Sequence, residues 1–155
     1  MSNDDPSSDL ERRLVDYPPF ELPHPGPRLE LTSSQTAANL AHFLSVRDER
    51  IELIRALSAS DGVSWPDGLD RAEHRSFIED LHGWAGRTWP AIAPADVGAY
   101  RAAVLDGART GEHIGASMAA DVALVIGELV RRARPSLDWG GYEGEGLIGG
   151  MPEAD

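Results

Sequence analysis

The sequence predicts an all-α protein, a compact bundle of four or five helices around a central apolar helix, with an extended N-terminal arm and a flexible C-terminal tail. Apolar residues recur at helical spacing in several long segments, and no stretch longer than five residues alternates strictly as a half-exposed strand does. Six of the eleven prolines lie in residues 1–31, and six glycines lie in residues 140–155. We therefore expect a disordered tail and proline-rich arm (1–31), a helical domain (32–139) and a glycine-rich acidic flexible tail (140–155).

The N-terminal arm is predicted to be an extended strap on the helical body. Residues 10–17, LERRLVDY, are long enough for two turns of helix. Five prolines between residues 18 and 27 then favour extended backbone, because proline fixes φ and disfavours helix in the residue before it. We expect Phe20, Leu22 and Leu29 to lie on the body. A ligand for a polyproline-binding partner is disfavoured, since no clean P-x-x-P with basic flanks occurs.

The first long helix is predicted between a cap at residues 32–34 and the Asp-Gly pair at residues 61–62. Its apolar residues lie mainly on one side, as in an amphipathic helix. Ser45 followed by acidic residues three and four positions later looks like a second capping signal. We therefore expect this helix to break into two at Ser45.

Two further helices are predicted before the central one. Residues 69–89 carry an apolar helical stripe, and prolines 90 and 94 bracket a short connector after it. A shorter helix follows at residues 97–105, beginning at Asp96. Glycines at positions 107, 111 and 115 are expected to loosen the link to the next helix.

The central helix is predicted at residues 117–134, the segment that is apolar on almost every side. Such a pattern is typical of a helix in the middle of a core, so we expect neighbouring helices to cover it on most sides. Three arginines occupy its last turn, where the helix dipole favours cations, and Pro135 ends it. Gly127 costs about 1 kcal/mol inside a helix. We therefore expect another helix or Trp139 to approach closely there.

Charge and composition limit the classes of function. The net charge is −12, but eight of the 26 acidic residues lie in segments 1–9 and 135–155, which contain no arginine. No basic patch is present for nucleic acid. Cysteine is absent, which excludes thiol chemistry and disulfides, and we find neither a signal peptide nor a run approaching the ~20 apolar residues of a membrane span. We expect a cytoplasmic protein. The use of arginine without lysine suits a high-GC bacterial source better than a halophilic one.

Motifs for catalysis or metal binding are incomplete. Glu79 and His82 form one Glu-x-x-His pair, but a di-iron bundle needs a second pair, and the chain has none. Ser117 lacks the closing glycine and the context of a nucleophile elbow. The glycine-rich tail lacks the strand and helix of a phosphate loop. We therefore predict no catalytic residue, no metal and no cofactor.

A polar cluster is the most informative candidate site. Asp121 and Glu128 lie seven residues apart, hence on one face of the central helix. Carboxylates beside apolar surface need hydrogen bonds or a cationic partner. Arg47 and Arg50 of the first long helix are candidate partners. A structural ion pair is favoured over an active-site acid, and the alternative stays open.

The tryptophans are candidate aromatic anchors. They are favoured as anchors of the core over a ligand cage. The candidates are Trp84, Trp89 and Trp139.

A resemblance adds to these predictions. The pattern combines apolar residues and arginines at positions 43–50, two tryptophans of the predicted helix at 69–89, and an aliphatic helix that contains Gly-Glu and is followed by Pro and Trp. Its residues are Phe43, Leu44, Arg47, Arg50, Leu81, Trp84, Trp89, Asp121, Gly127, Glu128, Pro135, Leu137 and Trp139. It resembles a pattern in uncharacterised small bacterial proteins, some of the immunity type. The resemblance implies a shared fold and a protein partner, and it brings no catalytic residues.

We therefore expect a non-enzymatic protein-binding module, immunity-like or regulatory, whose acidic surface favours a basic protein partner. Its oligomeric state is open. One alternative is a small-molecule-binding protein or enzyme that uses Asp121 and Glu128 with an arginine. Another is a structural component of a larger assembly. A reachable carboxylate in a concave site would favour the enzyme, and a sealed one would favour the binding module.

Overall fold

The computed structural model describes residues 6–66 and 71–140. Within these ranges the chain is helical and has no strand, which confirms the all-α prediction. The five α-helices are α1 (Pro6–Leu14), α2 (Ser33–Ala59), α3 (Arg71–Thr88), α4 (Val97–Leu105) and α5 (Ile114–Ala133). Three single turns of 3₁₀ helix are η1 (Arg28–Glu30), η2 (Trp89–Ile92) and η3 (Gly111–His113). The predicted tails at residues 1–5 and 141–155 lie outside the described residues.

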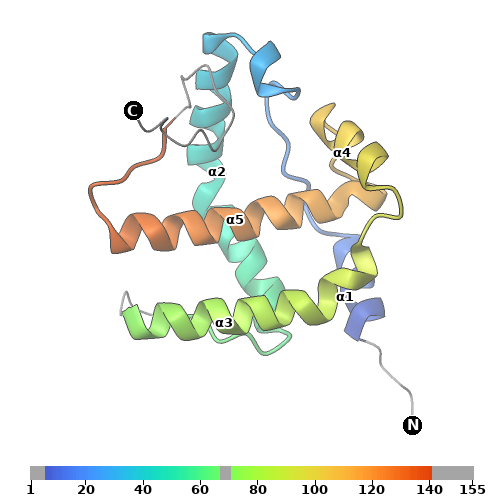
Figure 1. Ribbon diagram of the computed structural model, residues 1–155, viewed down its shortest axis with the longest axis vertical. Coiled ribbons are helices and arrows are strands. Elements are labelled where there is room, and N and C mark those ends of the chain that lie inside the picture. The colour runs from blue at the N-terminus through green and yellow to red at the C-terminus, as the bar shows by residue number, and fades with distance from the viewer. Residues whose placement is uncertain (1–5, 67–70, 141–155) are drawn as a thin grey trace, which may run out of the picture.

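The helices form two layers. In Figure 1, α5 crosses in front of α2, and α3 runs below α5 in the opposite direction. The helix α1 packs against α3 and η2, while α4 stands at the edge and contacts η3. No residue of α4 is buried, so this short helix is the least tightly packed of the five. The core therefore lies between the α5–α3 layer and α2, with α1 closing one end.

The core is built from one face of each of four helices. Trp84 is its largest fully buried side chain. The other members are Leu10, Leu14, Tyr17, Ile54, Leu57, Val63, Phe77, Leu81, Met118, Val122, Val125 and Leu129. On α5 the core residues recur every three or four positions, as expected for one buried stripe of a helix.

The N-terminal segment belongs to this core, which corrects the predicted domain boundary at residue 32. Leu10 is completely buried and Leu14 nearly so, and Tyr17 and Phe20 are buried after them. Residues 10–14 are helical as predicted, and Phe20 lies on the body as predicted. Leu29 does not, because its side chain is 88% exposed. The folded body therefore begins near Leu10, and the arm is part of its packing.

The helix α2 is continuous, so the predicted break at Ser45 is wrong. Thr32 caps α2 through a capping box, in which its hydroxyl accepts from the Gln35 backbone N–H at 3.2 Å. The Ser45 hydroxyl instead donates to the carbonyl of His42 at 2.7 Å. A serine bonded back to the preceding turn does not begin a new helix. The glycine at 62, with φ +86°, follows the end of α2.

Other parts of the chain bury only one side of α5, whereas the sequence predicts that neighbouring helices bury it on most sides. Its buried face includes Met118, Asp121, Val125 and Glu128. The opposite face is open, and Ile126 on it is 42% exposed. The segment Gly111–Ala133 is, by length and composition, apolar enough to cross a membrane, which the sequence prediction did not expect, but core helices of soluble proteins meet the same criterion.

Candidate functional site

The predicted carboxylate Asp121 lies at the crossing of α5 and α2, where Arg50 binds it. Arg50 Nε donates to Oδ1 at 2.8 Å and Nη2 donates to Oδ2 at 2.6 Å, a bidentate pair. The hydroxyl of Tyr17 also donates to Oδ2 at 2.5 Å. The Asp121 side chain is therefore satisfied by groups from two segments that are distant in sequence.

The same pair holds the proline-rich arm. Arg50 Nη1 donates to the carbonyls of Pro18 at 2.9 Å and Pro19 at 3.3 Å. The Arg50 guanidinium lies 5.5 Å from the ring centroid of Tyr17, which permits a cation–π interaction. Beside it, the backbone N–H of Phe20 donates to the hydroxyl of Ser117 at 2.8 Å. The cluster thus joins the arm, α2 and α5.

Burial seals this cluster from solvent. The exposed fraction of Asp121 is 0%, and Arg50 is also buried. Burial raises the pKa of the Asp121 carboxyl, against the opposing hydrogen bonds from Arg50 and Tyr17. Burial, together with the Asp121 hydrogen bond, also raises the pKa of Tyr17. Asp121 is not part of the walls of the cavities beside Tyr100 or beside Trp65. A substrate cannot reach this carboxylate, so its geometry fits the structural ion pair.

Glu128 forms a second cluster two turns along α5. Arg131 donates to its carboxylate at 3.0 Å, and Arg47 of α2 lies 3.5 Å from Oε1. The indole Nε1 of Trp139 donates to Oε1 at 2.5 Å. The chain after α5 therefore folds back, and the indole closes over Glu128.

The contacts of Glu128 favour the charged form of its carboxyl group. Burial would raise the pKa of its carboxyl, but the hydrogen bonds from Arg131 and Trp139 and the nearby charge of Arg47 outweigh burial and hold the pKa below its usual value. A small cavity of about 140 Å³ between α2, α5 and the 65–66 turn has Glu128 in its wall. Such a space holds a few water molecules and is too small for most metabolites.

Trp139 packs on a helical glycine. A Cβ atom built on Gly127 would lie 2.7 Å from Cζ2 of Trp139, and closer still to Cη2. On its other side, the ring meets Phe43 edge-on, with centroids 4.9 Å apart. The close approach expected at Gly127 is therefore made by Trp139.

The other two candidate tryptophans lie in and beside the core. Trp84 is completely buried, and its Nε1 donates to Asp61 at 2.7 Å. Asp61 in turn receives two hydrogen bonds from Arg13 of α1, each of 2.8 Å. Trp89 meets Trp84 edge-on at 6.4 Å. Trp139 lies elsewhere, against Gly127 and Phe43, so the three tryptophans do not form a common cage.

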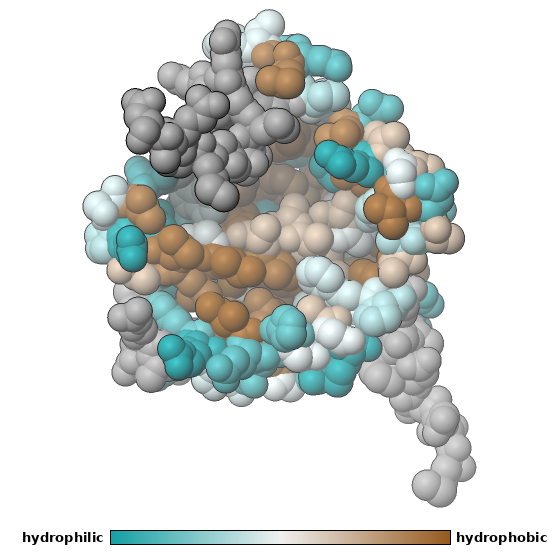
Figure 2. Space-filling view, viewed as in Figure 1, coloured by the Kyte–Doolittle hydropathy of each residue, from teal (hydrophilic) through white to brown (hydrophobic). Residues whose placement is uncertain are grey.

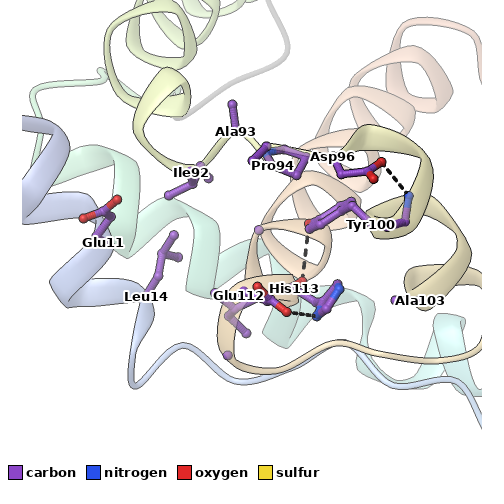
Figure 3. A pocket seen from close by; sticks show the side chains of 15 residues that line it. Glu11, Leu14, Ile92, Ala93, Pro94, Asp96, Tyr100, Ala103, Glu112 and His113 are labelled. Carbon is purple, nitrogen blue, oxygen red and sulfur yellow. Dashed lines mark hydrogen bonds and ion pairs between the residues drawn. The ribbon is translucent and has the colours of Figure 1, made fainter.

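A cavity of about 700 Å³ opens between α4, η3 and α1 (Figure 3). Tyr100 stands in it, stacked on the ring of His113 at 5.1 Å. Three carboxylates line it: Glu11, Asp96 and Glu112. The Asp96 carboxylate is already used, because it caps α4 by accepting from the Ala99 N–H at 2.9 Å. The cavity is therefore acidic, with apolar walls.

A second cavity of about 600 Å³ adjoins the first. Residues 92–94, Tyr100 and Gly115 line both. The second cavity lies between α3 and α5, where Trp89 and Met118 form part of a mainly apolar wall. Residue patterns in the sequence gave no indication of either cavity, because their walls combine residues of α1, α3, η2, α4, η3 and α5.

One side of α5 is an exposed apolar face, which we call the α5 face. It consists of Ala119, Ala123, Ile126, Val130 and Ala133, all exposed. Figure 2 shows apolar side chains along α5, brown toward its C-terminal half and paler toward its N-terminal half. The members are spaced by four, three, four and three residues, the repeat of a helix that packs against another helix. The same spacing is present in the sequence, where a helix that is apolar on almost every side predicts a position inside the core.

The remaining candidates show no assembled chemistry. Glu79 and His82 are both exposed on α3. Across residues 6–66 and 71–140, no three histidine or acidic side chains are placed to hold a metal ion. Ser117 is buried, and its hydroxyl is engaged with Phe20.

Comparisons with known proteins provide no further assignment. No family model, curated protein or solved structure matches this chain.

Proposed function

We propose that this chain is a non-enzymatic protein-binding module that acts through the α5 face. The observation that carries the proposal is that Ile126 and Val130 lie on an apolar helical stripe and have exposed fractions of 42% and 49%. Contiguous exposed apolar surface on a soluble domain is typical of a protein-binding site. Heptad spacing favours a helix as the element that binds there.

The state of the carboxylates supports binding over catalysis. Asp121 is sealed and paired with Arg50, and Glu128 is covered by Arg131 and Trp139. An enzyme that used these acids would need them within reach of substrate. Their contacts instead fix α5 against α2 and leave its other face free.

Capture from the native host tests the proposal. Tagged wild-type chain is compared with an Ile126→Asp variant, and we expect a protein that the wild type retains and the variant loses, because a carboxylate is costly in an apolar interface. Leu29→Asp is the matched control, since Leu29 is exposed and belongs to η1 rather than α5. Equal retention by wild type and Ile126→Asp would exclude the α5 face as the binding surface.

An immunity-like role is the finer form of the proposal. A toxin-like gene beside this one, and protection from that toxin lost in Ile126→Asp, would support it. A structural component of a larger assembly is the further alternative. It predicts that the purified chain sediments as an extended particle until neighbours are added.

A small-molecule-binding protein is the second candidate, favoured by the two adjoining cavities beside Tyr100. Together they offer an acidic part and an apolar part. A ligand with a cationic group and a hydrocarbon body would match both parts. Thermal unfolding with a panel of such amines tests this, and a shift in wild type that Tyr100→Ala abolishes would support it.

A further inference from the structure

We infer that the partner of the α5 face is a second copy of this chain, packed antiparallel across a two-fold axis. The inference rests on the proposed binding function of the α5 face and names its occupant. A two-fold interface must be complementary to itself, because the same surface contributes from both sides. The α5 face meets this condition in side-chain size, in surface relief and in charge.

Side-chain size is graded along the α5 face. The N-terminal half carries the small Ala119 and Ala123, and the C-terminal half carries the larger Ile126 and Val130. An antiparallel pair with its axis between residues 123 and 126 sets Ile126 against Ala123 of the second copy and Val130 against Ala119. Each large side chain then meets a small one, as knobs meet holes. A parallel pair would oppose alanine to alanine and leave gaps.

The shape of the surface also differs between the two ends of α5, with a hollow at the N-terminal half and a projecting side chain beyond the C-terminal half. The apolar cavity of about 600 Å³ lies at the N-terminal half of α5, between Gly115, Met118 and the end of α3. Beyond the C-terminal half, Leu137 is an exposed apolar side chain. The antiparallel arrangement brings the projecting end of one copy over the hollow end of the other.

Charge is also opposite at the two ends. The C-terminal end of α5 is followed by the exposed Arg134. The N-terminal end is bordered by Glu112, whose side chain is 88% exposed, and by the acidic cavity behind it. Antiparallel packing sets Arg134 of one copy near the acids of the other, and opposes the two helix dipoles favourably.

Disulfide trapping tests both the dimer and its direction, and the chain has no cysteine of its own. Two variants are made, Ala119→Cys and Val130→Cys. These positions are eleven residues apart, about 16 Å along a helix, whereas a disulfide needs Cα atoms within about 7 Å. We expect linked dimers under mild oxidation when the two variants are mixed, and few when either is oxidised alone. A mixture of Ala119→Cys with Val15→Cys is the control, because Val15 is exposed outside the α5 face.

Sedimentation over a concentration series measures the same association without a cross-link. We expect wild type to dimerise and Leu29→Asp to match it. Ile126→Asp is expected to raise the dissociation constant about a hundredfold or more, since each dimer carries the buried carboxylate twice. Ile126 is exposed within one chain, so this variant is expected to fold.

Three results would overturn the inference, and they distinguish it from the proposed function. Linking of each cysteine variant with itself would show a parallel pair. If the chain stays monomeric at every concentration but Ile126→Asp still abolishes capture of a different protein, the dimer is excluded and the proposed binding function remains. If the chain stays monomeric and removal of residues 141–155 makes the α5 face more accessible, the face binds a segment of its own chain. That result would exclude both the dimer and the proposed binding function.

Discussion

At the scale of single residues, Gly127 and Trp139 are fitted to each other. We predict that Gly127→Ala lowers the free energy of unfolding by about 1–3 kcal/mol, because the added methyl group overlaps the indole. This loss outweighs the gain of about 1 kcal/mol that alanine brings to a helix. Denaturant unfolding measures the change, and tryptophan fluorescence is expected to report the displaced ring.

Gly86 is the matched control, because it lies inside α3 and a Cβ there meets nothing within 4 Å. Gly86→Ala is expected to stabilise the chain by about 0.5–1 kcal/mol. If Gly127→Ala stabilised the chain equally, Trp139 would not pack where we describe it.

The buried pair of Asp121 and Arg50 is expected to contribute to stability rather than chemistry. Asp121→Asn keeps the shape but leaves the Arg50 charge buried without its counterion. We predict a loss of about 3–5 kcal/mol in the free energy of unfolding, measured by denaturant titration. Asp48→Asn also breaks an arginine pair, with Arg47, but at an exposed carboxylate, so we expect about 0–1 kcal/mol. Equal effects of the two substitutions would show that burial of Asp121 does not matter.

Glu128 makes the stability depend on pH. Its pKa is lower in the folded chain than the 4.5 of an unperturbed glutamate, so its contribution is present above pH 4.5 and is lost as the pH falls through the lowered folded pKa. We predict that the difference in unfolding free energy between wild type and Glu128→Gln shrinks over this acid range. Unfolding titrations at several pH values measure it, and a difference that is constant with pH would contradict the account.

Some of these residues were predictable and others were not. The spacing of Asp121 and Glu128 on one helical face, and of Arg47 and Arg50 on another, is local information that helical geometry converts into two neighbouring sites. The cost of a helical glycine pointed to close packing at Gly127. Tyr17 gave no signal, because its partner Asp121 is 104 residues away in the sequence.

At the scale of elements, α1 and the arm behave as part of the core. We predict that Leu10→Ala lowers the free energy of unfolding by about 2–5 kcal/mol, since Leu10 is completely buried. Val15→Ala, one residue beyond α1 and 81% exposed, is expected to change it by less than about 0.5 kcal/mol. Thermal or denaturant unfolding compares the two. A small effect of Leu10→Ala would mean that the arm is the loose strap the sequence suggested.

The positions of the helices were largely predictable from apolar periodicity and capping residues. Which faces of each helix are buried by neighbouring helices was not. Asp96 capped α4 as expected, but Ser45 resembled a cap and is bonded to the turn before it. For α5, alanines on the outer face made the helix look apolar all round, and alanine occurs both inside cores and at helix–helix contacts. Periodicity alone does not tell whether the helix that packs against an apolar face belongs to the same chain or to a partner.

At the scale of the whole molecule, α5 has one side that packs on the rest of the chain and one side that is exposed. One side carries Asp121 and Glu128, whose contacts fasten α5 to α2 and to the segment after it. The other side carries the α5 face and the adjoining hollows. Substitutions on the buried side are therefore expected to change stability, and substitutions on the α5 face to change association at unchanged stability.

Hydroxyl-radical footprinting of the α5 face tests the central claim most directly. Ile126 and Val130 are followed in dilute isolated chain, in concentrated chain and in extract of the native host, with Leu29 and Val15 as exposed references. The account predicts that labelling of Ile126 and Val130 falls as association proceeds while that of Leu29 and Val15 stays constant. Equal labelling of all four under every condition would contradict it.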